Sequence, residues 1–388
     1  MLEYFSRAKR SIADTIRTQM ETRGTAYAVA ARFMGPDAAA RLAEFSVRGK
    51  MLRGCLVRLG YELTAGREAT GEDERALALA GAAMELFQSG LLVHDDIMDR
   101  DRVRRGFPTL HVGYETALAQ GGYDDPPHYG EALGICSGDL AYFAAFQMLT
   151  ELPVAPERAL AAARVAAREL CLVGVAQMQD VANGAARRDS RDPFRPEGEP
   201  SGASPAAGAY EPDEESILRL YRYKTGRYTF SLPLALGAAL AGAPTEKSAA
   251  IEAAGEELGV LFQLKDDELG LFASAEELGK PIGADIREDK KTVLRLRLFA
   301  RAHEAAQTGD DTLAQLSGIF GRHDAEEAEI GYVRAAAERL GVRAELEREM
   351  EAYARRALEL ALPLTARAPA EAARAFRELV AYSRERRS

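Results

Sequence analysis

Tryptophan is absent from this chain, and cysteine and histidine are scarce, with three and five residues respectively. Cys55, Cys136 and Cys171 are scattered, so the pattern holds neither a disulfide framework nor a paired-cysteine metal site. The histidines lack the spacing of a zinc site. A net charge of −10 argues against general nucleic-acid binding, so we expect no nucleic-acid partner.

Long apolar runs are missing as well. No segment reaches about 18 uninterrupted apolar residues, the length that suggests a membrane-spanning helix. The first residues, Met1 to Arg7, lack the apolar core of a signal peptide. We therefore expect a cytoplasmic protein without a transmembrane segment.

Helix-forming residues are abundant: Ala, Leu, Glu and Arg dominate, and 47% of the chain is hydrophobic. Apolar residues recur at intervals of three and four, without sustained period-two alternation. The pattern predicts an all-α fold, a single bundle of antiparallel helices around a central cavity, with residues 1–388 as one domain. The predicted helices cover residues 2–33, 37–62, 73–98, 131–150, 155–182, 214–241, 246–271, 291–307, 326–340 and 344–362. Residues 183–215, rich in Pro, Gly, Ser, Arg and Asp, are predicted to form a mobile surface loop.

Two aspartate clusters each end an apolar helical run. The first holds Asp95, Asp96 and Asp99, and the second holds Asp266 and Asp267. On a helix, Asp95 and Asp99 share one face, where carboxylates pointing into a cavity can hold Mg²⁺ with places open for phosphates. The alternative is a solvated helix face, on which such like-charge pairs cost only about 0.2–0.5 kcal/mol. Burial of the flanking segments favours the metal site, because unpaired buried carboxylates are expensive.

Basic residues follow in several short segments. Arg104 and Arg105 come soon after the first cluster, and arginine suits phosphate. Lys50 and Arg53 lie three apart, so on a helix start they would present two cations to one point. Lys224-Thr225-Gly226 lies inside an amphipathic helix, which Gly226 and the Thr225 hydroxyl could loosen locally. Taken singly, these segments are better explained as solvated surface and as a merely tolerated glycine.

Together, the order and spacing of these segments resemble the trans-isoprenyl diphosphate synthases of the polyprenyl synthetase family. The resemblance runs from about Arg48 to Leu294. Besides the clusters and basic segments, it includes Gly138-Asp139-Leu140, Gln177 with Asp180, Phe262-Gln263, and Gly279-Lys280 through Lys290.

The resemblance implies a chain-elongating prenyltransferase that condenses isopentenyl diphosphate with an allylic diphosphate (dimethylallyl, geranyl or farnesyl), and a homodimer. By family resemblance, roughly three Mg²⁺ ions are bound. The metal ligands would be Asp95, Asp96, Asp99, Asp266 and Asp267. Isopentenyl diphosphate would be held by Lys50, Arg53, Gln88 and Arg105, and the allylic diphosphate by Arg104, Lys224, Lys280 and Lys290. Thr225 and Gln263 would face the reacting carbons, which together with Asp95, Asp99, Asp266 and Lys224 makes up the catalytic set. For His94, beside the first cluster, a core role is favoured over a direct one.

One position departs from the family pattern. The second cluster normally reads Asp-Asp-x-x-Asp, but its fifth position here is Gly270, and Glu268 would point elsewhere on the helix. We expect weakened rather than abolished activity. Two alternatives stay open: a non-catalytic or regulatory subunit of a heteromeric synthase, favoured only by Gly270, and a terpene cyclase. A cyclase has no use for a second diphosphate site, so Lys50, Arg53 and Arg105 speak against it.

Product length is expected to depend on the helix that ends at Asp95. Gly90 would leave one level of the product path open, and Leu91 would block it less than an aromatic residue. Phe87, with Met84 deeper, lies roughly 12 Å below Asp95 at 1.5 Å per residue. A phenyl floor there predicts mainly the twenty-carbon geranylgeranyl diphosphate. The alternative is that Phe87 packs against a neighbouring helix and stops nothing.

Overall fold

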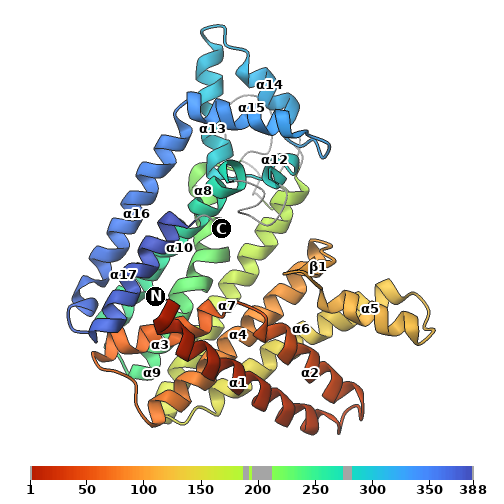
Figure 1. The fold of residues 1–388 in the computed structure, drawn as a ribbon, viewed down its shortest axis with the longest axis vertical. Coiled ribbons are helices and arrows are strands. Elements are labelled where there is room, and N and C mark those ends of the chain that lie inside the picture. Colours follow the sequence, from red (N-terminus) through yellow and green to blue (C-terminus); the bar gives the residue numbers. More distant parts are fainter. Residues whose placement is uncertain (1, 187–191, 195–211, 274–281, 387–388) are drawn as a thin grey trace. The chain divides into compact units, whose positions relative to one another are not determined.

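The computed structural model describes residues 2–186, 192–194, 212–273 and 282–386 (Figure 1). Its elements are almost all helical, which confirms the predicted all-α class. The helices are α1 (Leu2–Tyr27), α2 (Met34–Val47), α3 (Leu52–Ala65), α4 (Glu72–Met98), α5 (Leu110–Gln120), α6 (Pro126–Thr150), α7 (Pro156–Ala185), α8 (Glu214–Leu220), the π-helix η1 (Tyr221–Ser231), α9 (Leu232–Ala241), α10 (Thr245–Phe272), α12 (Ala284–Arg287), α13 (Val293–Ala306), α14 (Thr312–Ile319), α15 (Glu327–Arg339), α16 (Val342–Thr365) and α17 (Ala370–Glu385). A two-residue antiparallel ladder, β1 (Val103–Arg104) with β2 (Phe107–Pro108), was not expected.

The internal contacts divide the chain into two compact units, each built from separate stretches of sequence. Unit 1 comprises Met1–Arg168, Leu232–Ile251 and Pro363–Phe376, and unit 2 comprises Glu169–Ser231, Glu252–Leu362 and Arg377–Ser388. We describe each unit by itself. The single domain expected for residues 1–388 stays a prediction.

Helix α4 is the core helix of unit 1. It packs against α6, α3 and α1, and the side chains on most of its length are buried. Both α4 and α6 are long and apolar enough to cross a membrane by composition, but 83% of the apolar window of α4 is buried inside the protein. For α6 this share is 44%, so α6 presents an apolar face outward.

Close backbone contact joins α3 to α9 in the same unit. A Cβ atom added at Gly60 would lie 2.2 Å from the Leu234 carbonyl oxygen, and one added at Gly237 would lie 2.1 Å from that of Val57. Glycine is therefore required at this crossing, because any side chain would push the two backbones apart.

The N-terminal helices differ from the prediction in one respect that matters for the site. The prediction of one continuous helix over residues 37–62 is wrong, because the helix is interrupted between α2 and α3. Met51, at this interruption, has a left-handed φ of 54°. Helix α3 then begins at Leu52, so Lys50 precedes its first turn and Arg53 lies within it. The break thus delivers the two cations to a helix N-terminus, as their spacing predicts.

In unit 2 the segment around Lys224-Thr225-Gly226 is not a regular helix with a merely tolerated glycine, because residues Tyr221–Ser231 form a π-helix between α8 and α9 in the sequence. Such segments are rare and occur frequently at functional sites. Gly226 faces Gly259 of α10, where an added Cβ would lie 2.1 Å from the Gly226 Cα. The expected loop 183–215 lies largely outside the described residues, and Lys280 lies outside them entirely.

Candidate active site

The first aspartate cluster lies at the C-terminal end of α4. Asp99 caps the helix, and its N–H donates to the Asp95 carbonyl oxygen at 2.8 Å. Asp95 and Asp99 are therefore one turn apart on one face, as predicted. The helix dipole adds partial negative charge at this end. The carboxylate oxygens at this end of α4 favour the binding of a cation.

Asp96 has a different environment from its neighbours. Its side chain is fully buried, and its Oδ1 atom accepts a hydrogen bond from Arg104 Nε. The other oxygen, Oδ2, has no hydrogen-bond partner. Burial raises the pKa of Asp96 to about 6, although Arg104 opposes the shift. Arg104 Nη2 also lies 3.9 Å from Asp95, so this arginine neutralises the cluster in the metal-free protein.

Arg105 occupies the tip of the β1–β2 hairpin, with left-handed φ angles of 55° at Arg105 and 78° at Gly106. Positive φ at both central residues is the signature of a tight hairpin turn. The turn directs Arg105 onto Gly49: a Cβ there would lie 2.7 Å from Arg105 Nη1. Position 49 therefore requires glycine, because a side chain there would displace the Arg105 guanidinium from the backbone just before α3.

Glu85 on α4 is a residue that the sequence analysis missed. Its buried carboxylate accepts a hydrogen bond from the Gly54 N–H at 2.7 Å. Burial raises the pKa of Glu85, whereas the Gly54 N–H, Arg53 and Arg105 lower it. The carboxylate thus fixes the start of α3 and supplies counter-charge to two cations assigned to isopentenyl diphosphate. A glutamate inside an apolar helix, ten residues before Asp95, was the available signal.

Two other residues assigned to isopentenyl diphosphate lie on the same two helical segments. Gln88 is buried three residues after Glu85 on α4, and Lys50 is exposed before α3. Their assignment to isopentenyl diphosphate stays a prediction.

In unit 2, Asp266 near the end of α10 is held by the C-terminal helix. Arg386 Nη2 donates to Asp266 Oδ1 and to the Phe262 carbonyl oxygen, the latter at 3.1 Å. The guanidinium carbon lies 3.7 Å from the centre of the Phe262 ring. Asp266 remains 42% exposed, whereas the Arg386 side chain is only 8% exposed. Arg386 thus pairs with Asp266, an aspartate that is predicted to bind a metal.

Asp267 does not take the metal-facing place that the sequence assigned to it. Its side chain is buried and accepts a hydrogen bond from the Tyr221 hydroxyl, which itself accepts from the Val293 N–H at 3.1 Å. Burial raises the pKa of Asp267 to about 8. This carboxylate therefore ties α10 to η1. Glu268 points elsewhere, as expected, and pairs with Lys265 at 2.6 Å.

The lysines assigned to the allylic diphosphate are paired with carboxylates. Lys224 of η1 contacts Asp180 of α7, and Lys290 Nζ lies 3.7 Å from Asp285 Oδ1. Although burial opposes it, the negative charges of Asp285 and Asp267 raise the pKa of Lys290 above its usual range. Thr225 and Gln263 are half-buried on η1 and α10. Of the lysines assigned to the allylic diphosphate, Lys224 and Lys290 thus each pair with a carboxylate, whereas Lys280 lies outside the described residues.

The donor chemistry fits Mg²⁺ together with phosphate rather than a metal held by protein alone. Over the described ranges, no three His, Cys, Asp or Glu side chains are gathered closely enough to hold an ion. Mg²⁺ is commonly bound by one or two carboxylates plus substrate phosphates and water. Arg104 and Arg386 mark the two places where the protein already stabilises a cation.

Side chains of α6 pack against the part of α4 that was predicted to set product length. Phe87 is fully buried, with its ring edge-to-face against Phe146 at 4.9 Å between centroids. At Gly90, an added Cβ would lie 2.8 Å from the Tyr142 ring. Met84 is fully buried and Leu91 half-buried.

His94 packs against the same helix. Its Nε2 atom lies 3.1 Å from the Ile135 carbonyl oxygen, and a Cβ at Gly138 would lie 2.3 Å from Nε2. This contact explains the glycine of Gly138-Asp139-Leu140 and fits the packing role favoured from the sequence.

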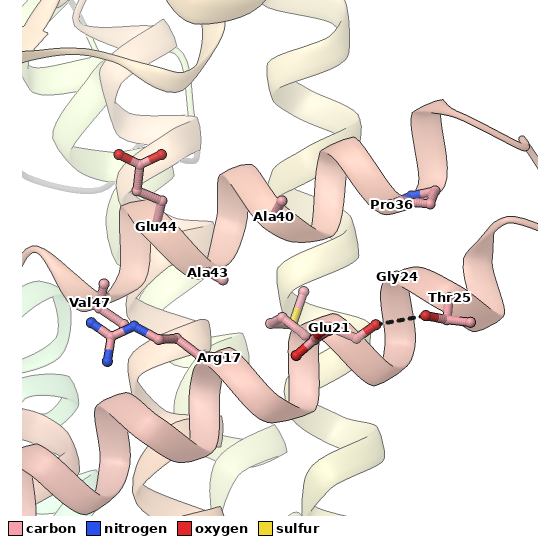
Figure 2. Close-up of a pocket in the computed structure, with 10 residues that line it drawn as sticks. Arg17, Glu21, Gly24, Thr25, Pro36, Ala40, Ala43, Glu44 and Val47 are labelled. Atoms are coloured by element: carbon pink, nitrogen blue, oxygen red, sulfur yellow. Dashed lines mark hydrogen bonds between the residues drawn. The ribbon is translucent and has the colours of Figure 1, made fainter.

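A groove of about 490 Å³ lies elsewhere in unit 1, between α1 and α2 (Figure 2). Arg17 and Glu21 line it from α1, and Pro36 and Glu44 from α2. The lining contains none of the residues assigned to the site.

Comparison with known proteins places these features in a family. The sequence model of the polyprenyl synthetase family matches residues 39–336. A geranylgeranyl diphosphate synthase from Sulfolobus acidocaldarius is 33% identical, over 67% of this chain and 66% of that protein. A geranylfarnesyl diphosphate synthase from Aeropyrum pernix is 31% identical, over 66% and 67%. The crystal structure of geranylgeranyl pyrophosphate synthase from Corynebacterium glutamicum, complexed with isoprenyl diphosphate and magnesium, is 26% identical with a TM-score of 0.75, covering 97% of this chain and 99% of that one.

The arginine on Asp266 leads to a prediction about metal affinity. Arg386→Gln should tighten substrate-free Mn²⁺ binding about two- to fivefold, because a partly exposed ion pair worth up to about 1 kcal/mol no longer competes with the metal. Electron paramagnetic resonance titration of free Mn²⁺ measures the change. Arg384→Gln, which removes pairs to Glu351 and Glu385 on the same helix, is the control. Unchanged or weaker Mn²⁺ binding in Arg386→Gln would contradict the competition.

Proposed function

The chain belongs to the polyprenyl synthetase family, and from this membership we propose that it is a chain-elongating prenyltransferase. It condenses isopentenyl diphosphate with an allylic diphosphate: dimethylallyl, geranyl or farnesyl. The observation that carries the proposal is the Arg105 guanidinium held against Gly49 just before α3, in the unit that also bears Asp95 and Asp99. One diphosphate needs the cations, and the other needs metal-binding carboxylates.

The cation group also favours elongation over the two alternatives. A terpene cyclase binds one diphosphate, so it has no use for the guanidinium held against Gly49. A non-catalytic subunit has no need for both the Arg105 guanidinium held against Gly49 and the lysines Lys224 and Lys290.

The proposed chemistry depends on how these residues stabilise the charge that develops during the reaction. The allylic carbon–oxygen bond breaks, the isopentenyl double bond attacks the resulting allylic cation, and a proton is then lost to the departing diphosphate. Arg104 in unit 1, and Lys224 and Lys290 in unit 2, are the basic residues that would bind diphosphate and stabilise the charge that grows on it in the transition state. Asp95 and Asp99 in unit 1, and Asp266 in unit 2, would hold Mg²⁺, which would supply further positive charge. Gln263 and Thr225 present neutral dipoles to the reacting carbons, so no side-chain nucleophile is required.

Metal dependence tests this function directly. Asp95→Ala and Asp99→Ala should each lower kcat by several orders of magnitude, because each removes a ligand from the helix face at the end of α4. Product formation from isopentenyl diphosphate, each allylic primer and Mg²⁺ measures the effect. Asp14→Ala, at an exposed acid of α1, is the control. Full turnover in excess chelator would rule the metal mechanism out.

The two diphosphate sites should separate kinetically. Lys50→Ala and Arg53→Ala are expected to raise KM for isopentenyl diphosphate more than KM for the allylic primer. Lys224→Ala should do the reverse, because Lys224 pairs with Asp180 rather than with the Glu85 group. Steady-state kinetics with each substrate varied in turn measures the split. Equal weakening of the same substrate by all three variants would disprove the assignment.

We propose that the main product is geranylgeranyl diphosphate, with the Phe87–Phe146 pair as the floor of the product path. Support comes from the buried aromatic contact and from the relatives named geranylgeranyl diphosphate synthase. The relatives named geranylfarnesyl diphosphate synthase make the next longer chain the main competitor.

Phe87→Ala should shift the product to 25 carbons or longer, because it removes one ring of the floor. Product chains are sized by chromatography after removal of the diphosphate. Phe376→Ala, which empties a buried site on α17, controls for general loosening of the core. Unchanged products in Phe87→Ala, or equal lengthening in the control, would reject the floor. Gly90→Phe is a poor test, because Tyr142 and the Gly138 backbone oxygen occupy the space.

We also propose a homodimer that covers the exposed face of α6. Ile135 and Phe143 lie eight residues apart on this helix and are 47% and 68% exposed. Apolar area of this kind is costly in water and typical of an interface. Sedimentation equilibrium should show a dimer that Phe143→Asp weakens and that Val29→Asp, in the turn after α1, leaves intact. A monomeric wild-type chain would contradict the proposal.

A further inference from the structure

The π-helix η1 carries an arginine on each side of Lys224 and Thr225. Arg222 lies two residues before Lys224, and Arg227 lies three residues after it. In an α-helix, residues five apart point about 140° away from each other around the axis, so their side chains diverge. The i→i+5 hydrogen bonds of a π-helix instead bring such residues onto one face. The two arginines therefore share a face only while η1 keeps its π geometry.

One glutamate of α10 pairs with both arginines. Arg222 Nε lies 2.7 Å from Glu256 Oε1, and Arg227 Nη1 donates to Glu256 Oε2 at 2.6 Å. Glu252, one turn earlier on the same face of α10, lies 3.4 Å from Arg227 Nη2. Because Glu256 contacts two residues that are five apart on η1, this pairing favours the π register over an α-helical one.

Helix α7 supplies a third carboxylate to Arg227. Its Nε and Nη2 atoms both donate to Glu169, at 2.8 Å each, in the bidentate geometry that suits a guanidinium and not an ammonium group. The Glu169 side chain is 1% exposed, so its charge would be costly without this partner. Through one side chain, Arg227 thus joins η1 to α7 and α10, and all of these residues belong to unit 2.

The π-helix meets α7 a second time at Lys224. Lys224 contacts Asp180 of α7 and keeps 29% of its side chain exposed, so a ligand can reach it. Arg227 and Lys224 therefore fix η1 to α7 at two points. A change of register at Arg227 would turn Lys224 away from Asp180, because a change of register rotates every residue of the helix about its axis.

We propose that Arg227 is a positioning residue of the diphosphate site: its ion pairs with Glu169 and Glu256 hold the π register of η1, which places Lys224. This inference rests on the proposed function, in which Lys224 binds the allylic diphosphate. All three nitrogen atoms of the Arg227 guanidinium donate to carboxylates, so Arg227 acts through Lys224 and does not touch the substrate. A misplacement of about 1 Å in a binding group is enough to slow an enzyme by about a hundredfold.

Arg227→Lys tests the proposal, because it keeps the charge and removes the bidentate contact. It should lower kcat/KM for the allylic primer about tenfold and leave KM for isopentenyl diphosphate within about twofold, since only Lys224 is displaced. Steady-state kinetics with each substrate varied in turn measures the split. Arg356→Lys, at an arginine that pairs with Glu257 of the same helix α10, is the matched control and should behave like the wild type.

A double-mutant cycle separates positioning from general destabilisation. In a Lys224→Ala background, Arg227→Lys should cost less than about twofold in kcat/KM for the allylic primer, because the group that it positions is gone. Equal losses in both backgrounds would overturn the proposal, since Arg227 would then act independently of Lys224. Wild-type kinetics in an Arg227→Lys variant that is folded by circular dichroism would overturn it as well.

Glu256→Gln keeps the proposal testable if Arg227→Lys fails to fold. It removes the charge that both arginines share but leaves buried Glu169 paired with Arg227. The same split between the two substrates should appear at about two- to fivefold, the size expected for a partly exposed ion pair. Equal weakening of both substrates in this variant would contradict the proposal.

A binding measurement separates this inference from the proposed function. Isothermal titration calorimetry with inorganic diphosphate and Mg²⁺ does not depend on elongation, and the same coupling between Arg227→Lys and Lys224→Ala should appear in the affinity. A wild-type chain that shows this coupling but elongates no allylic primer would overturn the proposed function and leave the positioning role of Arg227 in place. Elongation without coupling in either measurement would overturn the positioning role alone.

Discussion

Concentrated negative charge at the end of a buried helix is the constraint on which this structure depends. Helix α4 is the core of unit 1, and it ends in three aspartates where the helix dipole is already negative. Such an end is unstable without a cation nearby. Arg104 supplies positive charge to the aspartate cluster in unit 1, and Arg386 supplies positive charge to Asp266 in unit 2. Both arginines reach the clusters from segments outside the cluster helices.

The basic residues are likewise stabilised by groups of opposite charge. The positive charges of Arg53 and Arg105 act on Glu85, Lys224 meets Asp180, and Lys290 meets Asp285. A partly buried charge that loses its only partner is costly, whereas exchanging one partner for another is not. Under the proposed function, a diphosphate would replace carboxylates on the lysines, and a metal would replace guanidinium on the aspartates.

Local patterns in the sequence predicted the helices that carry this chemistry. Apolar periodicity placed α4 and α10 to within a residue or two, whereas it predicted one continuous helix where the π-helix η1 lies. Contacts between distant residues were not predictable in this way. Arg386 lies 120 residues from Asp266, and Tyr142 fills the space beside Gly90 from another helix. Asp267 was misassigned because helix periodicity does not show that Tyr221 draws its carboxylate inward.

Gly270 shows that the members of a motif are better identified from their positions in the fold than from their positions in the sequence. A missing aspartate in the second cluster was the sole observation that favoured a non-catalytic subunit. In the folded chain a carboxylate is nevertheless present there, because Gly283 and Gly321 hold α12 against the end of α10. Asp285 also pairs with Lys290, so this short element brings an acid and a base together at the end of α10. The glycine at position 270 is therefore no evidence on its own for a non-catalytic subunit, because the folded chain keeps a carboxylate beside it.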